Sequence, residues 1–509
     1  MRFETKRSIR LYLLIFALDS PWVLTLQMSQ AAWLRHLCQD SVAKTANTEI
    51  PRKGKTAMDA HSRKVVQENR DYTMFSWSVQ GAAAPMHLKR AQGVHFWDGD
   101  DNRWLDFSSQ LINLNVGHQH PKMLEAIKKQ VDELCFAGPS FATEPRGELG
   151  KKLSEVTGLA KTFFTLGGAE ANENAMKMAK LVTGRPKIIT RYRSYHGATM
   201  GAMTASGDPR RWPVEPGIPG IVRVFDPYCY RCPFGQKVET CHRECVSHIE
   251  EVIQMEGPKS IAAIMVEGIT GSNGLLIPPD DYYPKLRALC DKYGLLLITD
   301  EVMSGFGRTG AWLATQHYGI RPDMVTCAKG LTSGYMPLGA VIVSDAVAKY
   351  FETNMLWGGL TYSGHPVSCA AAVANLRIYE EDGIFANVAG RGEQLGQRLE
   401  AMKRKYRCVG DVRHIGLFSV LELVKDKTTR EPLAPFNGSS PEMMKLAAHL
   451  KSRHLYAFSR FNMLWVCPPL IINEAELNAG LDIVEEALGV VDAALAPTEE
   501  PASVGSVRP

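Results

Sequence analysis

The sequence predicts an α/β fold, in which a mostly parallel sheet flanked by helices forms a large domain and a smaller α/β domain accompanies it. Two observations lead to this prediction. Several short runs in the middle of the chain are apolar throughout and alternate with helical patterns, as expected of parallel strands that are buried on both faces. The chain is 509 residues long, which is more than one hydrophobic core normally supports. The apolar runs are 162–166, 187–192, 261–266, 295–299, 324–327 and 340–343.

Changes in composition and periodicity divide the chain into segments. The first segment lacks sustained periodicity and is expected to be a leader, while the last is rich in Pro, Ser and Glu and is expected to be disordered. The large domain lies in the middle, and the segments on either side of it are expected to combine into the smaller domain. The predicted segments are 1–57 (leader), 58–117 (N-terminal part of the small domain), 118–370 (large domain), 371–495 (C-terminal part of the small domain) and 496–509 (tail).

Local patterns predict further elements on both sides of the sheet. A helix is expected to start after Pro121, with apolar positions at Met123, Ile127 and Val131. Ahead of it, aromatic-rich runs predict short strands. The other expected elements are strands at 93–98 and 103–107, a pair of strands within 416–424, and helices at 371–379, 395–406 and 474–488.

The composition is that of an ordinary globular enzyme, with 45% apolar and 22% charged residues. A formal net charge of +4, much of it near the N-terminus, gives no reason to expect a nucleic-acid or membrane partner. An apolar run at 11–18 follows basic residues, but it is too short to cross a bilayer. We therefore expect a cytoplasmic protein, with a mitochondrial presequence, or a true start at Met28 or Met58, as the alternatives.

The chain has 11 cysteines, most of them in apolar contexts that are typical of buried free thiols in a reducing compartment. A closer group, spaced C-x2-C-x8-C-x3-C, consists of Cys229, Cys232, Cys241 and Cys245. Such a set could hold zinc or an iron–sulfur cluster. Because the central spacer is shorter than in common zinc modules, free thiols in a loop or a redox-labile pair are favoured, and no metal is predicted.

Two strand ends hold the residues on which the functional prediction depends. Asp300 follows the apolar run at 295–299, and Lys329, between two small residues, follows the run at 324–327. Pyridoxal phosphate (PLP) must be held as a Schiff base on a lysine, with its ring nitrogen kept protonated by a nearby acid so that the ring can accept electrons. A carboxylate and a lysine at neighbouring strand ends suit both needs. Taken singly, each is more commonly a capping acid or a surface lysine.

A glycine-containing turn could bind the phosphate of such a cofactor. Gly167, Gly168 and Ala169 follow an apolar strand and open a helix, where backbone N–H groups and the helix dipole converge on an anion. We place the phosphate at Gly168 and Ala169. A tight turn without a ligand is the commoner explanation of a bare Gly-Gly pair, so this assignment depends on the other motifs.

Residues in neighbouring loops could contact the ring itself. Tyr195 and His196 follow the run at 187–192, and a tyrosine there could stack on a pyridine ring, although a tyrosine at a sheet edge is the commoner reading. If the chain stays extended beyond Asp300, Val302 faces the same way as that carboxylate and could press on the opposite ring face. Thr361, in a glycine-rich loop, could offer a hydroxyl to the phosphate.

Together these motifs resemble the class III, or ω-amino acid, aminotransferases of PLP fold type I. The resemblance runs from about Trp77 to Leu488 and is specific, because the motifs occur in order and the acid-to-lysine spacing fits. The matching motifs are Gly-Gly-Ala-Glu-Ala (167–171), Ser-Tyr-His-Gly (194–197), Thr-Asp-Glu-Val (299–302), Gly-Phe-Gly-Arg-Thr-Gly (305–310), Ala-Lys-Gly (328–330) and Thr-Tyr-Ser-Gly-His-Pro (361–366).

The resemblance implies roles for individual residues. It implies that Lys329 forms the imine with PLP, that Asp300 pairs with the ring nitrogen, and that Tyr195 and Val302 enclose the ring. Thr361 would reach the phosphate from the partner subunit, which implies a homodimer, or a dimer of such dimers, with shared active sites. The remaining cofactor contacts that it implies are Gly168, Ala169, His196 and Glu267.

The same resemblance bears on the substrates. In the family, an arginine ahead of a Pro-Pro pair often grips a substrate carboxylate, and Arg460 takes this position. The arginine that binds the α-carboxylate in ornithine-type members falls at Trp465 here, which favours pyruvate over 2-oxoglutarate as the acceptor. The presence of Trp77 resembles the taurine–pyruvate and β-alanine–pyruvate branch of the family, and this resemblance implies that Trp77 contacts the substrate.

We therefore predict a PLP-dependent aminotransferase that moves an amino group from an ω-amino acid of the taurine, β-alanine or 4-aminobutyrate class to pyruvate by a ping-pong mechanism. The alternatives are a class III aminotransferase that uses another amine or 2-oxoglutarate, and an aminomutase of the same fold. A PLP-binding protein without turnover is disfavoured because Lys329 and Asp300 are both present. A nicotinamide enzyme is disfavoured because the glycine turn lacks the spaced fingerprint that dinucleotides need.

Overall fold

A seven-stranded sheet is the central element of the computed structural model, which describes residues 58–495. β10 runs antiparallel to both of its neighbours, and the other pairs of adjacent strands are parallel. All the predicted apolar runs are strands of this sheet, and β6 is a further strand that was not predicted. The strand order is β4 (Lys161–Thr165), β10 (Gly339–Val343), β9 (Met324–Cys327), β8 (Leu296–Asp300), β7 (Ile261–Glu267), β5 (Lys187–Arg191) and β6 (Ile221–Val224).

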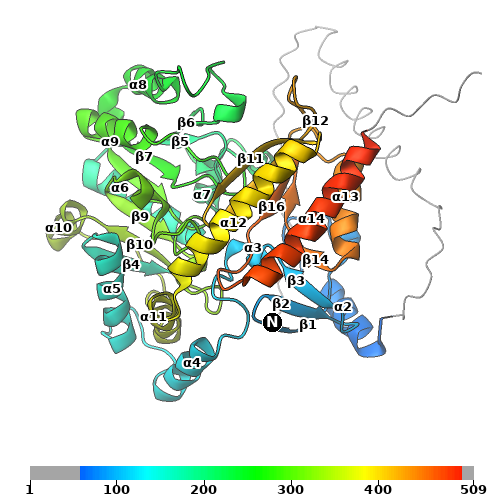
Figure 1. The fold of residues 1–509 in the computed structure, drawn as a ribbon. Helices are drawn as coiled ribbons and strands as arrows, with labels where there is room; N and C mark the ends of the chain where they lie inside the picture. The colour runs from blue at the N-terminus through cyan, green and yellow to red at the C-terminus, as the bar shows by residue number, and fades with distance from the viewer. Residues whose placement is uncertain (1–57, 496–509) are drawn as a thin grey trace, which may run out of the picture. The chain divides into compact units, whose positions relative to one another are not determined.

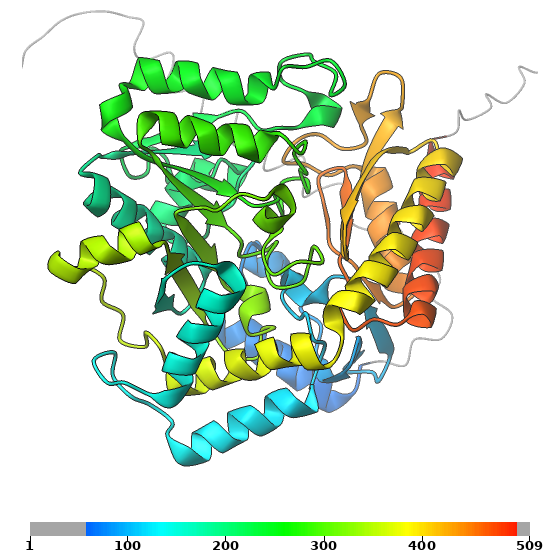
Figure 2. The same ribbon diagram turned by 60° about the vertical axis from the view of Figure 1, so that its left-hand side comes forward.

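Helices cover both faces of this sheet (Figures 1 and 2). Side chains alternate along β7: Ala263 and Met265 pack in a cluster with α6 (Gly168–Thr183), whereas Ile264 and Val266 pack with α8 (Glu244–Glu256) and α9 (Tyr282–Tyr293) on the other side. This two-sided burial explains why β7 is apolar along its whole length. The other helices on the sheet faces are α10 (Asp345–Thr353), α5 (Glu144–Thr157) and α11 (Pro366–Glu381).

Two smaller sheets are built from the segments on either side of the large one. The first has the order β1 (Leu88–Gln92), β2 (His95–Asp98), β3 (Arg103–Asp106) and β14 (Leu455–Tyr456). The second has the order β11 (Val409–Ile415), β12 (Phe418–Asp426), β16 (Met463–Val466) and β15 (Ser459–Arg460), with β13 (Glu431–Pro432) paired to β12. Because β14 pairs with β3, the N-terminal and C-terminal segments share a sheet. The helices α12 (Ile384–Lys405) and α14 (Glu474–Ala494) contact each other beside this second sheet (Figure 1).

The predicted pair of strands within 416–424 is wrong. This stretch is part of the single strand β12, which pairs with β11 across a turn at Gly416 and Leu417. Gly416 has a φ of 55°, which suits a turn. Residues 418–424 are all buried, including the polar Ser419 and Glu422, and they pair with β11 on one side and β16 on the other, so one strand spans them.

The predicted helices are present with wider bounds. The helix expected after Pro121 is α4 (Pro121–Glu133), in which Met123 is buried but Val131 is exposed. The helices expected at 371–379, 395–406 and 474–488 are α11, α12 and α14. The remaining elements are α2 (Ala60–Tyr72), α3 (Ser109–Ile112), α7 (Met200–Ala205), α13 (Pro441–Ser452) and the 3-10 helices η1 (Gln80–Ala82), η2 (Pro209–Val214), η3 (Cys229–Arg231), η4 (Pro258–Ser260), η5 (Ala314–Tyr318) and η6 (Lys329–Leu331).

Within residues 58–495, no helix has both the length and the apolar character needed to cross a membrane. The predicted leader (1–57) and tail (496–509) lie outside the described residues. The division of the rest at 117/118 and 370/371 remains a proposal, which the pairing of β14 with β3 supports.

Candidate active site

Three ionisable residues meet at the carboxyl ends of adjacent parallel strands. Glu267 ends β7 and lies opposite Asp300, which ends β8. Asp300 in turn lies opposite Thr326 of β9, the strand that leads to Lys329. All three ionisable side chains line one pocket of about 920 Å³. The sheet register therefore brings together a lysine and two carboxylates that are distant in the sequence.

The Asp300 carboxylate is buried and held by three donors. Its Oδ2 accepts hydrogen bonds from Asn172 Nδ2 at 2.7 Å and, with the proton on Nδ1, from His196 Nδ1 at 2.8 Å. Its Oδ1 accepts from the backbone N–H of Val302 at 2.9 Å. Asn172 also accepts a hydrogen bond from Thr326, so its amide is fixed by β9 as well. The carboxylate thus has one position at the floor of the pocket.

Lys329 has a lowered pKa and an unusual backbone. Burial lowers the pKa of its amine, and the nearby Asp300 and Glu267 carboxylates oppose this shift. Its φ of 42° lies in the left-handed region, where residues other than glycine are uncommon. Backbone outliers of this kind occur at sites where the surrounding structure imposes the conformation. An amine that loses its proton easily is suited to act as a base and nucleophile.

The N-terminus of α6 opens into the same pocket. Gly167, Gly168 and Ala169 all line it, and the dipole of this 16-residue helix favours an anion there. A Cβ on Gly168 would lie 2.8 Å from both methyl carbons of Val302, so no larger residue fits without a shift. Val302 lies in a turn, not on an extended segment as the sequence argument assumed, because its N–H bonds back to Asp300.

Tyr195, His196 and Glu267 also line the pocket, and Asn172 of α6 donates a hydrogen bond to the backbone carbonyl of His196 at 2.7 Å. The Glu267 carboxylate accepts the backbone N–H of Tyr195 at 2.9 Å and that of Gly271 at 2.8 Å. Burial raises the pKa of Glu267, and the charge of Asp300 raises it further. Glu267 therefore fixes the loop that presents the Tyr195 ring. His196 is buried, and its Nε2 has no hydrogen-bond partner among the described residues.

These groups fit PLP. The helix N-terminus suits its phosphate, the amine suits its aldehyde, and the buried carboxylate suits its ring nitrogen. The space that Gly168 leaves beside Val302 keeps that helix end open.

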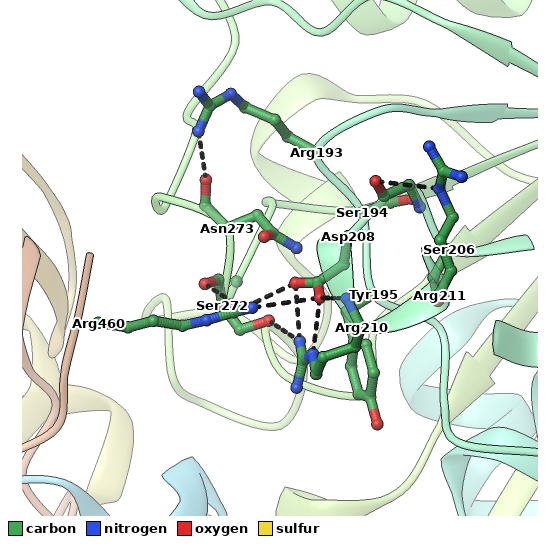
Figure 3. Close-up of polar contacts among 12 residues, drawn as sticks. Arg193, Ser194, Tyr195, Ser206, Asp208, Arg210, Arg211, Ser272, Asn273 and Arg460 are labelled. Atoms are coloured by element: carbon green, nitrogen blue, oxygen red, sulfur yellow. Dashed lines mark hydrogen bonds and ion pairs between the residues drawn. The ribbon is translucent and has the colours of Figure 1, made fainter. Parts of the chain in front are cut away.

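Arg460 lines the pocket and is paired with an aspartate (Figure 3). Its Nη1 lies 2.7 Å from Oδ2 of Asp208, a side chain with no solvent exposure. Asp208 also binds Arg210, whose guanidinium lies 3.5 Å from the centroid of the Tyr195 ring. The exposed Trp77 lines the pocket too and meets the Tyr195 ring edge-on at 6.4 Å between centroids. Both predicted substrate-contact residues therefore lie at this pocket.

Two sets of predicted residues lie elsewhere. Thr361 is exposed and does not line the pocket of its own chain. The four clustered cysteines are free and line a separate cavity of about 20 Å³. Burial raises the pKa of Cys245 to about 12, and the neighbouring cysteines add to the shift. In the described part of the chain, no group of three or more His, Cys, Asp or Glu side chains is arranged to hold a metal ion.

The sequence argument missed several residues of the site. Asn172 lies one helical turn after Gly168, so the spacing of four could have placed it at the pocket. Asp208, Arg210 and Ser272 had no such signal, because a loop and a 3-10 helix bring them to the pocket wall.

Residues 77–488 match the sequence pattern of the family described as aminotransferase class-III. The chain belongs to the class III aminotransferase family. It is 34% identical over 418 residues to the taurine–pyruvate aminotransferase of Bilophila wadsworthia, covering 78% of this chain and 91% of that protein. It is also 34% identical over 424 residues to the putrescine–pyruvate aminotransferase of Pseudomonas aeruginosa, covering 80% and 91%. The protein is thus a class III transaminase with PLP as its cofactor.

A solved structure agrees with this assignment. The taurine:2-oxoglutarate aminotransferase from Bifidobacterium kashiwanohense, in complex with PLP and glutamate, has a TM-score of 0.83 and 44% sequence identity. The match covers 85% of this aminotransferase and 99% of that chain. The predicted family, fold and cofactor are therefore confirmed.

Proposed function

We propose that this aminotransferase moves the amino group of an ω-amino acid of the taurine, β-alanine or 4-aminobutyrate class to pyruvate by a ping-pong mechanism. The observation that carries the proposal is that Lys329 and Arg460 line one pocket. A substrate with an amine at one end and an acid at the other can place one group at each. The Bilophila relative, named for taurine and pyruvate, supports this choice of substrates.

When bound, PLP supplies an electrophilic carbon and an electron-accepting ring. Gly168 and Ala169, at the start of α6, would hold its phosphate through their backbone N–H groups. Asp300 holds a proton on the ring nitrogen, while His196 and Asn172 keep its carboxylate in place. Tyr195 and Val302 line the same pocket and would restrain the two faces of the ring.

Lys329 moves the proton that transamination requires. Its Nζ lines the pocket, where it would take the proton from the substrate carbon that bears the amine and hold that proton for return. The lowered pKa of this amine suits the task, because a base with a high pKa would hold its proton near neutral pH. The buried pocket floor keeps competing water away from that proton.

We also propose that the enzyme works as a homodimer, in which Thr361 reaches the phosphate site of the partner subunit. The exposed position of Thr361, away from the pocket of its own chain, supports this arrangement. A cytoplasmic location remains a prediction from the free thiols, and a mitochondrial one its alternative.

2-Oxoglutarate is a second candidate acceptor. The Bifidobacterium enzyme, named for taurine and 2-oxoglutarate, is 44% identical to this chain, a higher identity than that of the pyruvate-named relatives. Pyruvate is favoured by Trp465, which stands where ornithine-type members have their α-carboxylate arginine and which is fully buried here.

A donor panel with the two acceptors tests the proposal. Taurine, β-alanine, 4-aminobutyrate and putrescine are each offered with pyruvate or with 2-oxoglutarate, and alanine and glutamate are quantified. The proposal expects alanine from an acidic ω-amine as the main product. Glutamate as the main product would show that 2-oxoglutarate, and not pyruvate, is the acceptor. Putrescine as the preferred donor would contradict the proposal that the donor carries an acid group.

A further inference from the structure

Asp208 lies behind the pocket wall at which the two arginines meet. It does not line the pocket, whereas Arg210, Arg460 and Ser272 do. Its side chain has no solvent exposure, while those of Arg210 and Arg460 are 21% and 16% exposed. Figure 3 shows the two guanidinium groups reaching the same carboxylate, Arg460 from the left of the view and Arg210 from below.

The Asp208 carboxylate is saturated with hydrogen bonds. Oδ1 accepts from the backbone N–H of Arg210 at 2.8 Å, from its Nε at 2.8 Å and from Arg460 Nη2 at 3.2 Å. Oδ2 accepts from Arg210 Nη2 at 3.0 Å and from Arg460 Nη1 at 2.7 Å. A carboxylate offers about four lone-pair positions, so Asp208 has no capacity left for a substrate.

The charges on this wall do not cancel. Burial alone would raise the pKa of Asp208, but the hydrogen bonds and charges of Arg460 and Arg210 lower it well below its ordinary value. Asp208 is therefore ionised and contributes one negative charge against two guanidinium groups, which leaves one positive charge in excess. The other carboxylates of the pocket are committed elsewhere, since Glu267 binds backbone N–H groups and Asp300 binds His196.

We propose that Asp208 is a positioning residue that fixes both arginines and limits the excess charge of the wall to one, so that the wall binds one acid group of a substrate at a time. This inference rests on the proposed function, in which Arg460 receives a substrate acid. The Nη1 of Arg210 makes no hydrogen bond to a described residue. Its Nη2 donates a hydrogen bond to the hydroxyl of Ser272 at 3.1 Å, which helps to fix the guanidinium group. The arginines are thus presented to the pocket in fixed orientations, which lowers the entropy lost when an anion binds.

A pair of isosteric anions tests this charge count. Methanesulfonate and sulfate have similar shapes but differ by one charge, and neither has an amine that could react. Their affinities for the PLP-loaded enzyme are measured by calorimetry for the wild type, Asp208→Asn and Asp208→Glu. Asp208→Asn raises the excess charge from one to two, and a dianion gains more from the added charge than a monoanion does.

We expect Asp208→Asn to raise the affinity of sulfate relative to methanesulfonate by at least about tenfold. Asp208→Glu restores the charge and should keep the wild-type ratio. Loss of mechanical support alone would weaken both anions alike and leave the ratio unchanged, and that outcome would overturn the proposal.

Arginine variants test the same count without altering Asp208. Arg460→Met leaves no excess charge, so binding of both anions should fall at least about tenfold. Arg211→Met is the matched control, because Arg211 does not line the pocket and pairs with Glu215. If Arg460→Met kept methanesulfonate binding, the wall would not be the anion site.

These measurements separate the inference from the proposed function. Neither anion is a substrate, so a donor panel that rejects taurine, β-alanine and 4-aminobutyrate would contradict the proposed function and leave the anion data unaffected. Conversely, the enzyme could accept these donors while Asp208→Asn leaves the ratio of the sulfate and methanesulfonate affinities unchanged. That result would contradict only the inference about Asp208.

Discussion

Nδ1 of His196 lies 2.8 Å from Oδ2 of Asp300, and both side chains are buried. The contact joins the loop after β5 to the end of β8, so a residue that is 104 positions away in the sequence orients the carboxylate at the pocket floor. Asn172 gives the same oxygen a second donor from α6. The proposed ring partner of PLP, at the end of β8, is therefore held by side chains from two other elements of the fold.

Replacement of Asp300 should damage catalysis more than replacement of His196. Asp300→Asn keeps the shape but removes the negative charge, so we expect kcat to fall by at least about a hundredfold. His196→Ala leaves the charge and the Asn172 donor, so the loss should be nearer tenfold. Single-turnover reaction with the best donor measures both. Equal losses in the two variants would contradict the supporting role assigned to His196.

The space beside Gly168 should be needed for cofactor binding. Gly168→Ala puts a methyl group 2.8 Å from two carbons of Val302, and such overpacking typically costs about 1–3 kcal/mol. We expect the Kd of PLP to rise about tenfold. Gly167→Ala is a matched control, because a Cβ there meets nothing within 4 Å. Comparable weakening in both variants would show that the contact with Val302 is not the cause.

The lowered pKa of Lys329 makes the stability of the apoenzyme depend on pH. Between that lowered pKa and the ordinary value of about 10.4, the unfolded chain binds more protons than the folded chain. Stability therefore rises with pH across this window, and the cost of the buried amine is fully present below it. Apo Lys329→Met should therefore have a higher free energy of unfolding than the apo wild type near neutral pH, by about 1.4 kcal/mol for each pH unit by which folding lowers the pKa of Lys329.

Urea unfolding of the two apoproteins from about pH 7 to about pH 10 checks this sign. The advantage of Lys329→Met should shrink as the pH rises, because the unfolded wild type then loses its proton too. A difference that stays constant over this range would show that the pKa of Lys329 is not lowered in the folded apoprotein.

The strand ends could be predicted from the sequence because burial on both faces leaves a continuous apolar signal. Asp300 and Lys329 interrupt that signal where β8 and β9 end. Because adjacent parallel strands end at the same edge of a sheet, the sequence could predict that these two residues lie close together. The same signal failed within 416–424, where the buried part of β12 includes the polar Ser419 and Glu422, and the turn that joins it to β11 lies at the start of the stretch, at Gly416 and Leu417. The antiparallel direction of β10 also leaves no mark in its composition.

The pairing of Asp208 with Arg460, on which the proposed anion site depends, could not be predicted from the sequence for a different reason. Asp208 and Arg460 are 252 positions apart; Asp208 precedes the 3-10 helix η2, and Arg460 lies in β15, which at two residues is too short to show a period in the sequence. Arg460 was predicted from the family pattern, which could not reveal its partner. Val302 was placed correctly at the pocket although the assumed extended backbone is a turn, because its N–H bonds to Asp300 and brings the side chain against Gly168.

Loss of the Lys329 amine should abolish turnover while the fold remains. Lys329→Ala removes both the covalent attachment point and the proton carrier, so we expect transamination to fall by at least about a thousandfold. Circular dichroism and the oligomeric state should match those of the wild type. A purified variant that transaminated at the normal rate would show that another residue performs the proton transfer.

Borohydride reduction of the PLP-loaded wild type, followed by peptide mass mapping, tests the central claim most directly. Reduction makes the link between the cofactor and its lysine permanent. We predict one modified peptide, the one that contains Lys329, and no modified peptide from Lys329→Ala. Modification of a different lysine in the wild type, or of none, would contradict the assignment of the active site.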